Sequence, residues 1–240
     1  MGRHEEWFAA GGGMTTVQGF LGARAARALS AILTYQRDAG LKGSIAEIGA
    51  FQGKTFIGMA LAAESEERAI GLDIFPGDTA ERLLAGLKAA LPADTRAQVQ
   101  IAKTDSTKLT ALDWINLLKS PARFVHIDGD HTHDAVLSDI QLATSYLAAG
   151  GVVVIDDFLH EWYPDVTEGI IDGLRVAKNL RPVAVVPRSG AFLSGGTKLV
   201  CTTPDAVDRH LTLLRATFPE LKGRSLKLAG HTCWAFFNND

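Results

Sequence analysis

Four aspartates and one histidine lie in two short stretches of the sequence, each directly after an apolar run. The five residues are Asp128, Asp130, His131, Asp156 and Asp157. If the two runs are neighbouring strands, several carboxylates crowd one pocket and raise one another's pKa unless a cation balances them. Carboxylate oxygens suit magnesium, calcium or manganese. The spacing therefore predicts a divalent-cation site. The alternative is that Asp130 or Asp157 caps a helix and the other carboxylates are hydrogen-bonded or solvated.

A glycine loop with an acidic residue before it forms the second candidate site. The pattern Glu47-x-Gly49-x-x-x-Gly53 lies between a predicted strand and a predicted helix, where glycine lets the backbone turn sharply and approach a ligand. Asp73 follows Gly53 by 20 residues, at the end of the next predicted strand. An acid at that position typically binds ribose hydroxyls, so the loop and the acid together indicate an adenosine-type ligand. The alternative is that Glu47 and Asp73 are ordinary strand-end carboxylates.

Lys54 and Thr55, directly after this loop, also permit a P-loop interpretation, which would make the protein a nucleotide hydrolase. A P-loop has four residues between its glycine and the Gly-Lys-Ser/Thr end, whereas this loop has three between Gly49 and Gly53. The interpretation predicts ATP binding at Lys54 and Thr55, and the length of the loop argues against it.

Short apolar segments, rich in β-branched residues, alternate with helical segments and would position these candidate residues. The predicted strands are 45–49, 69–73, 99–103, 123–127 and 152–156, and the predicted helices between them are 54–64, 79–90, 108–119 and 134–147. This alternation is typical of a doubly wound α/β domain with a parallel sheet. In such a sheet, ligands bind outside the carboxyl ends of the strands. The glycine loop and the aspartates should therefore share one rim.

Further elements flank this alternating core. An irregular start at residues 1–14 precedes one or two helices between Val17 and Ala39. A helix at 165–180 follows the core, and then two strands at 182–187 and 197–202. The connection between these two strands is too short for a parallel crossover, so we expect them to pair antiparallel.

A helix at 205–217 and an aromatic tail, Trp234–Phe237, come last. The tail is either part of the core or an interface patch, which leaves a homo-oligomer open. We predict one domain over 1–240, and no linker divides it. Its parts are an N-terminal helical extension (1–43), a core (44–202) and a C-terminal helix and tail (203–240).

Composition argues against several classes of protein. Hydrophobic residues make up 47% of the 240 residues and charged residues 21%, an ordinary globular balance. The net charge of −3 gives no electrostatic footprint for nucleic acid, and no apolar run approaches the roughly 20 residues of a membrane helix. Met1–Gly13 has no signal-peptide core, and Cys201 and Cys233 form no metal-type pair. We therefore expect a reduced, cytoplasmic setting.

The chain resembles the class I S-adenosylmethionine-dependent methyltransferases over roughly residues 44–202. The resemblance implies a Rossmann-like, seven-stranded sheet whose last strand pair is antiparallel. It also implies that Asp73 binds the ribose of the cofactor and that Asp105 and Ser106 lie near its adenine. The methionine end of the cofactor would be held by Glu47, Gly49, Ala50, Phe51 and Gly53.

Two segments, 126–136 and 150–158, are similar to a narrower branch, methyltransferase family 24, which includes macrocin-type, metal-dependent sugar O-methyltransferases. That resemblance implies a magnesium site made by Asp128, Asp156 and Asp157, with Asp128 also beside the cofactor. It implies a general base that is either His131 or Asp130. It also implies that the acceptor is a hydroxyl of a small molecule.

Acid–base chemistry favours His131 over Asp130 as the base. A hydroxyl bound to a metal becomes more acidic and a nearby base can take its proton. Histidine titrates in the working range, whereas an aspartate beside a cation stays ionised and weakly basic. A sugar or a vicinal diol would suit a metal that grips two oxygens. A cofactor-binding fold without metal-dependent chemistry is the alternative function.

Two segments are candidates for a lid or a wall of the acceptor site. They are the N-terminal helical segment and the loop Leu159–Asp165, which carries Trp162 and Tyr163. The alternative is that these aromatic residues serve packing alone. His126 lies inside a predicted strand, so we expect it to be structural.

Overall fold

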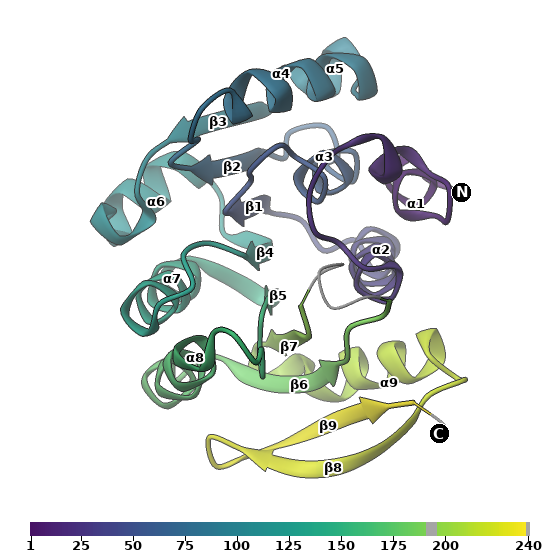
Figure 1. The fold of residues 1–240 in the computed structure, drawn as a ribbon, viewed down its shortest axis with the longest axis vertical. Coiled ribbons are helices and arrows are strands. Elements are labelled where there is room, and N and C mark those ends of the chain that lie inside the picture. Colours follow the sequence, from purple (N-terminus) through teal and green to yellow (C-terminus); the bar gives the residue numbers. More distant parts are fainter. Residues whose placement is uncertain (191–195, 239–240) are drawn as a thin grey trace.

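A computed structural model describes residues 1–190 and 196–238. Within these residues a nine-stranded sheet runs in the order β3-β2-β1-β4-β5-β7-β6-β9-β8 (Figure 1). The strands are β1 (Ser44–Ile48), β2 (Ala69–Asp73), β3 (Val99–Lys103), β4 (Ala122–Ile127), β5 (Leu147–Ile155), β6 (Arg181–Val186), β7 (Lys198–Thr202), β8 (Lys222–Leu228) and β9 (His231–Phe237).

Helices cover both faces of this sheet and bury its apolar side chains in two clusters (Figure 1). One face is covered by α1 (Arg3–Phe8), α2 (Ala23–Asp38), α3 (Phe56–Ala60), α4 (Thr79–Ala90) and α9 (Val207–Thr217). The other is covered by α6 (Ala111–Leu118), α7 (His133–Ser145) and α8 (Pro164–Val176). The described residues also form short helical turns, which are α5 (Ala93–Arg96), η1 (Gly13–Thr16), η2 (Ser106–Lys108) and η4 (Pro204–Ala206). The predicted doubly wound α/β fold is thus confirmed.

Strands β1 to β5 are parallel, and β7 lies antiparallel between β5 and β6. The predicted antiparallel pair of late strands is therefore correct. β1, β4, β7 and the last two-thirds of β5 are buried throughout, which explains why each reads as a continuous apolar run rather than an alternating one.

The predicted number of seven strands is wrong, because the C-terminal tail is itself a hairpin. Strand β9 pairs in parallel with β6, where Ala184 lies opposite Trp234, and β8 pairs antiparallel with β9. The mixed polar and aromatic residues of β8 and β9 suit an outer hairpin, half-buried on one side only. The tail therefore belongs to the sheet.

The N-terminal segment also differs from the expectation. Residues 1–14 were expected to be irregular, but they include α1 and the start of η1. Trp7 and Phe8 of α1 are buried against Gly58 of α3, whose missing side chain makes room for both rings. This close contact is long-range, so no local periodicity reports it. The helix expected between Val17 and Ala39 begins only at Ala23.

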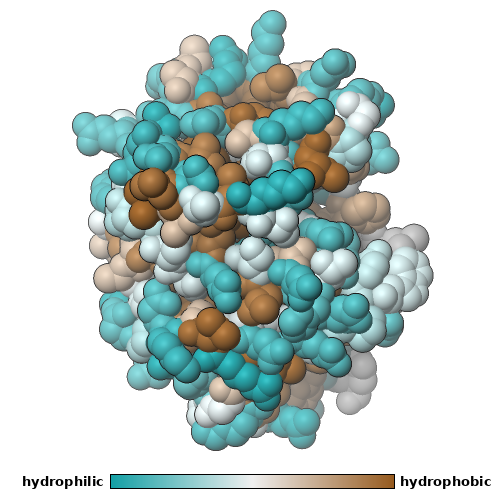
Figure 2. All heavy atoms as spheres, turned by 90° about the vertical axis from the view of Figure 1, so that its left-hand side faces the viewer, coloured by the Kyte–Doolittle hydropathy of each residue, from teal (hydrophilic) through white to brown (hydrophobic). Residues whose placement is uncertain are grey.

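Surface features of the fold are ordinary. None of its helices in the described ranges is long and apolar enough to span a bilayer. Figure 2 shows one face of the molecule, on which hydrophobic residues lie in several separate groups among hydrophilic ones.

Candidate active site

A pocket of about 1040 Å³ lies along the carboxyl ends of β1, β2, β3, β4 and β5. Twelve of the thirteen site residues predicted from the sequence line it, and they are Glu47, Gly49, Ala50, Phe51, Asp73, Asp105, Ser106, Asp128, Asp130, His131, Asp156 and Asp157. The thirteenth, Gly53, faces Leu83 and Ile57. The rim predicted from the strand ends is therefore a real cavity, as expected for an open parallel sheet.

The loop after β1 needs glycine at two positions. Gly49 has φ +91°, and a Cβ on it would lie 1.8 Å from the carbonyl oxygen of Asp128. Gly53 has φ +89°, and a Cβ there would lie 2.3 Å from Leu83. Glycine at these sites lets the loop pass close to the end of β4 and lets α3 pack against α4. We call Glu47–Gly53 the glycine loop.

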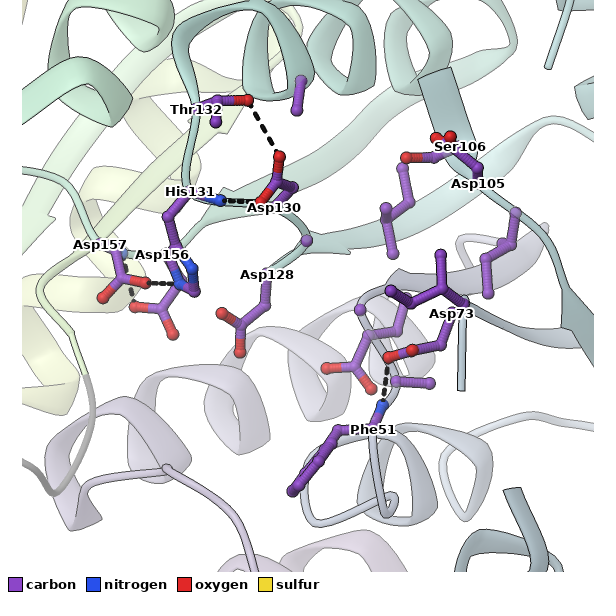
Figure 3. Close-up of a pocket in the computed structure, with 18 of the residues that line it drawn as sticks. Phe51, Asp73, Asp105, Ser106, Asp128, Asp130, His131, Thr132, Asp156 and Asp157 are labelled. Atoms are coloured by element: carbon purple, nitrogen blue, oxygen red, sulfur yellow. Dashed lines mark hydrogen bonds and ion pairs between the residues drawn. The ribbon is translucent and has the colours of Figure 1, made fainter. Parts of the chain in front are cut away.

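Asp73 links the glycine loop to the turn after β2. Its Oδ2 accepts a hydrogen bond from the Phe51 backbone N–H at 2.8 Å (Figure 3). Its Oδ1 accepts one from the Phe75 backbone N–H at 2.6 Å. Both bonds orient the carboxylate at the mouth of the loop. Asp73 lines the pocket, and each of its carboxylate oxygens can accept a further hydrogen bond.

Glu47 and His126 form a buried pair on the neighbouring strands β1 and β4, which place them opposite each other. Glu47 Oε1 lies 2.7 Å from His126 Nδ1. Burial raises the pKa of Glu47 well above its usual range and lowers that of His126 well below. The two shifts agree on a neutral pair that shares a hydrogen bond. Glu47 Oε2 and His126 Nε2 have no hydrogen-bond partner within the described part of the chain.

We call Asp128, Asp156 and Asp157 the acid cluster; they lie together with His131 (Figure 3). Donor atoms of Asp128, His131 and Asp157 lie within 4.8 Å of one another, as do those of His126, Asp128 and Asp156. Burial is the main reason why the pKa of Asp128 is raised. The oxygen-rich donor set fits a hard divalent cation.

His131 is held by Asp157. Its Nε2 lies 2.8 Å from Asp157 Oδ2, and its ring stacks on Tyr163 with centroids 4.2 Å apart. The hydrogen bond to Asp157 raises the pKa of His131, while partial burial opposes the shift. The residue that bonds this ring, Asp157, has φ +54°, a backbone conformation that is uncommon outside glycine and often occurs at functional sites.

Comparison with known proteins gives one matching family model. Residues 46–158 match a model described as a methyltransferase domain, and that range contains all thirteen site residues predicted from the sequence. Residues 46–158 carry a methyltransferase domain. Among curated proteins, none matches this sequence.

Solved methyltransferases share the fold of this domain. An O-methyltransferase from Bacillus cereus, solved with S-adenosylhomocysteine, has 15% identity and a TM-score of 0.59 over 84% of this chain and 90% of its own. CalS11, a TDP-rhamnose 3'-O-methyltransferase of calicheamicin biosynthesis, has 18% identity and a TM-score of 0.56 over 73% and 77%. TomG from Streptomyces achromogenes, solved with S-adenosylmethionine, has 18% identity and a TM-score of 0.53 over 74% and 78%.

Lys198 lies beside the acid cluster and was not among the residues predicted from the sequence. Leu199 of β7 pairs with Ile155 of β5, so Lys198 lies beside Asp156. Its side chain is 1% exposed, and its ammonium donates a hydrogen bond to Asp156 Oδ2. Burial lowers the pKa of Lys198 to about 8. The sequence contains a signal for this residue, since a lysine begins an otherwise apolar strand. A lysine buried there needs a charged partner, because lysine is almost never buried without one.

Two predicted residues of the methyltransferase domain have carboxylates that bond to their own turns. Asp130 accepts hydrogen bonds from His131 N–H at 3.0 Å and from the Thr132 hydroxyl at 3.1 Å, and it points away from the acid cluster (Figure 3). Asp105 accepts from the Thr107 N–H and hydroxyl at 3.1 and 2.6 Å. Both residues line the pocket, but these bonds hold their carboxylates in the loops after β4 and β3.

Two segments close the pocket of the methyltransferase domain from the side. His160, Trp162 and Tyr163 come from the loop after β5, and His160 stacks on Tyr163 with centroids 4.8 Å apart. Gly19 and Phe20 come from the N-terminal segment.

Lys54 connects the N-terminal segment to the glycine loop. Lys54 Nζ donates to Gly19 O at 3.0 Å, and Trp7 Nε1 donates to Lys54 O at 2.9 Å. These bonds tie the N-terminal segment to the end of the glycine loop. The P-loop interpretation would require the lysine to reach a phosphate, whereas this lysine bonds a carbonyl of its own chain.

Proposed function

We propose that the protein transfers a methyl group from S-adenosylmethionine to a hydroxyl of a small molecule, assisted by a divalent cation. One observation carries the proposal. A single pocket is lined at one end by the glycine loop and Asp73 and at the other by the acid cluster and His131. A methyl donor at the first end and a hydroxyl at the second would be adjacent, and methyl transfer needs chiefly that alignment.

The cofactor end is assigned from chemistry and from the fold. The Asp73 carboxylate has lone pairs left for ribose hydroxyls after its two backbone bonds. Ser106 and Asp105 line the part of the pocket after β3, where the adenine would lie. The ligands of the Bacillus cereus enzyme and of TomG, S-adenosylhomocysteine and S-adenosylmethionine, support this assignment.

His131 is assigned as the general base. Asp157 holds its Nε2 and Tyr163 packs on its ring, so the imidazole has a defined orientation at the pocket wall. The two hydrogen bonds of Asp130 to its own loop support His131 over Asp130. In the reaction, neutral His131 accepts the hydroxyl proton and Asp157 stabilises the imidazolium that forms.

Asp128, Asp156 and Asp157 would hold the cation. A bound divalent cation would lower the pKa of an acceptor hydroxyl and fix its position. The oxygen-rich donors within 4.8 Å of one another support this assignment. Trp162 and Phe20 would exclude water from the acceptor and shape its site.

A sugar or another vicinal diol is the acceptor class we favour. Two adjacent hydroxyls can both bind one cation, and the acid cluster lines the same pocket that would hold the acceptor. The activity stated for CalS11, on the 3'-hydroxyl of TDP-rhamnose, supports a sugar acceptor.

Calorimetric titration of S-adenosylmethionine, with ATP as the control ligand, tests the cofactor assignment. We expect micromolar binding of S-adenosylmethionine and none of ATP. Asp73→Ala should weaken that binding at least about tenfold, because a good hydrogen bond to a charged group contributes about 1.5–3 kcal/mol. Unchanged affinity in Asp73→Ala would show that the ribose assignment is wrong, and binding of ATP alone would favour the nucleotide hydrolase.

A chelator tests the metal assignment once an acceptor has been found by screening diols. We expect EDTA to abolish turnover and added Mg²⁺ to restore it, while S-adenosylmethionine still binds. Asp157→Ala should act like the chelator, because it removes a proposed metal ligand and the partner of His131. Full turnover in the presence of EDTA would rule out metal assistance.

A further inference from the structure

Lys198 places a positive charge beside Asp156, one of the residues of the proposed metal site. Its side chain is 1% exposed, and Asp156, its hydrogen-bond partner, is 4% exposed. The second Asp156 oxygen accepts the Asp157 backbone N–H at 2.7 Å. Both oxygens of this carboxylate are therefore bonded within the protein itself.

The groups around Lys198 lie on one face of the sheet. Glu47 is opposite His126, and His126 is opposite Val154 in the strand register. Side chains two residues apart along a strand share a face, so Asp128 lies on the face of His126, and Asp156 on that of Val154. Lys198 thus faces the neutral pair, Glu47 and His126, and two carboxyl groups of the acid cluster, those of Asp128 and Asp156.

Side chains of the protein already engage two of the three carboxylates. Lys198 pairs with Asp156, and His131 pairs with Asp157. The mutual repulsion that would otherwise demand a bound cation is reduced by these pairs. A divalent ion entering this site would have to displace Lys198 from Asp156 or bind beside a fixed positive charge.

We infer that Lys198 is a tethered cation that competes with a divalent metal for the acid cluster. The acid cluster is then assembled without metal, and the charge of Lys198 keeps its affinity for a divalent metal low. The inference rests on the proposed function in one respect, that the acid cluster is the metal site. Lys198 acts through Asp156 and is a positioning residue.

Direct measurement of Mn²⁺ binding, by the electron paramagnetic resonance signal of free Mn²⁺, tests the inference without any turnover. Lys198→Met replaces the lysine by an apolar side chain of similar length, which frees Asp156 and removes the opposing charge. We expect Mn²⁺ to bind at least about tenfold more tightly to Lys198→Met than to the natural chain, because like charges a few ångströms apart repel each other.

Two matched variants control for charge and for folding. Lys222→Met removes a lysine from the exposed edge strand β8, and Lys198→Arg keeps the charge at the site. Both should bind Mn²⁺ as the natural chain does. Lys198→Gln serves if Lys198→Met does not fold, as judged by circular dichroism. A lysine with a merely structural role would give the opposite result, because its loss would loosen the cluster and weaken Mn²⁺ binding.

The outcomes separate this inference from the proposed metal assistance. Unchanged or weaker Mn²⁺ binding in Lys198→Met overturns the inference while the metal site stands, provided the natural chain binds Mn²⁺. Binding in Lys198→Met alone supports the inference and argues against metal assistance in the natural chain. Binding in neither protein overturns both.

Discussion

Burial decides which residues of this site carry charge. Glu47 and His126 are both nearly inaccessible, and the loss of water favours the neutral form of each. Lys198 is equally buried, but the carboxylate of Asp128 opposes the lowering of its pKa. Asp157 is partly open to the pocket and can pair with His131. The site thus combines a neutral pair, Glu47 and His126, with neighbouring residues that carry charge.

His131→Gln tests the general base at the scale of one residue. Glutamine can still donate a hydrogen bond to Asp157, but it cannot accept a proton from the acceptor. We expect kcat to fall by about 100-fold or more, the usual contribution of a general base, while the Kd of S-adenosylmethionine stays within about threefold.

His133→Gln is the matched control for that variant. His133 lies two residues further on, outside the pocket lining, and pairs with Asp134 and Asp172. Its replacement should leave kcat unchanged. Equal losses in both variants would mean that the loop, and not the imidazole of His131, matters.

Asp139 provides a pH-dependent test of burial behind the pocket. It is buried on α7, next to Gly129, and burial raises its pKa from 3.8 to about 6. Protons therefore bind the folded state more tightly than the unfolded state. The stabilising effect of protonated Asp139 is complete below about pH 4 and is lost as pH rises to about 6.

Asp139→Asn should remove this loss. We expect the free energy of unfolding of the variant, relative to the natural chain, to rise by about 2 kcal/mol between pH 4.5 and 7.5, measured by urea denaturation. Asp208→Asn, at an exposed position on α9, is the control and should show a change below about 0.5 kcal/mol. A difference that stays flat with pH in Asp139→Asn would contradict a raised pKa.

At the scale of elements, the C-terminal hairpin is the clearest departure from the sequence-based expectation. Phe236 of β9 is 5% exposed and packs edge-to-face on Phe218, with centroids 5.7 Å apart. Arg215 of α9 lies over the ring of Trp234 at 3.7 Å. Of the two choices left open for the aromatic tail, core holds for Phe236, which points inward, whereas Phe237 is 41% exposed.

This alternation gives a matched pair of variants. Phe236→Ala should lower the free energy of unfolding by about 3–5 kcal/mol, because it leaves a cavity in the core. Phe237→Ala, one residue on and facing outward, should cost less than about 1 kcal/mol. Chemical denaturation measures both, and similar losses would mean that β9 is not ordered as described.

At the scale of the whole molecule, the function depends on the meeting of five strand ends. Each of the strands β1 to β5 contributes to the site at its carboxyl end, in turn with the glycine loop, Asp73, Ser106, His131 and Asp157. These residues come together only because the five strands are parallel neighbours. The N-terminal segment and the loop after β5 then close the sides of the pocket. No single segment of the chain contains the site.

The amino-acid sequence by itself determined the alternating core, the antiparallel late strands and twelve of the pocket-lining residues. The elements and the acids at strand ends follow from local properties, such as runs of β-branched residues and glycine at turns, whereas Ala50, Phe51 and Ser106 were expected from the resemblance to methyltransferases. Gly49 could be singled out for the same reason, because its role is a backbone conformation.

Only the tertiary structure decided the partners of those residues. Strand register brings Lys198 to Asp156 and Glu47 to His126, and the course of one loop turns Asp130 away from the acid cluster. The ninth strand and helix α1 likewise exist because distant segments bury them. Pairing between residues far apart in the chain leaves no local periodicity, so burial, and with it charge, is settled by the fold.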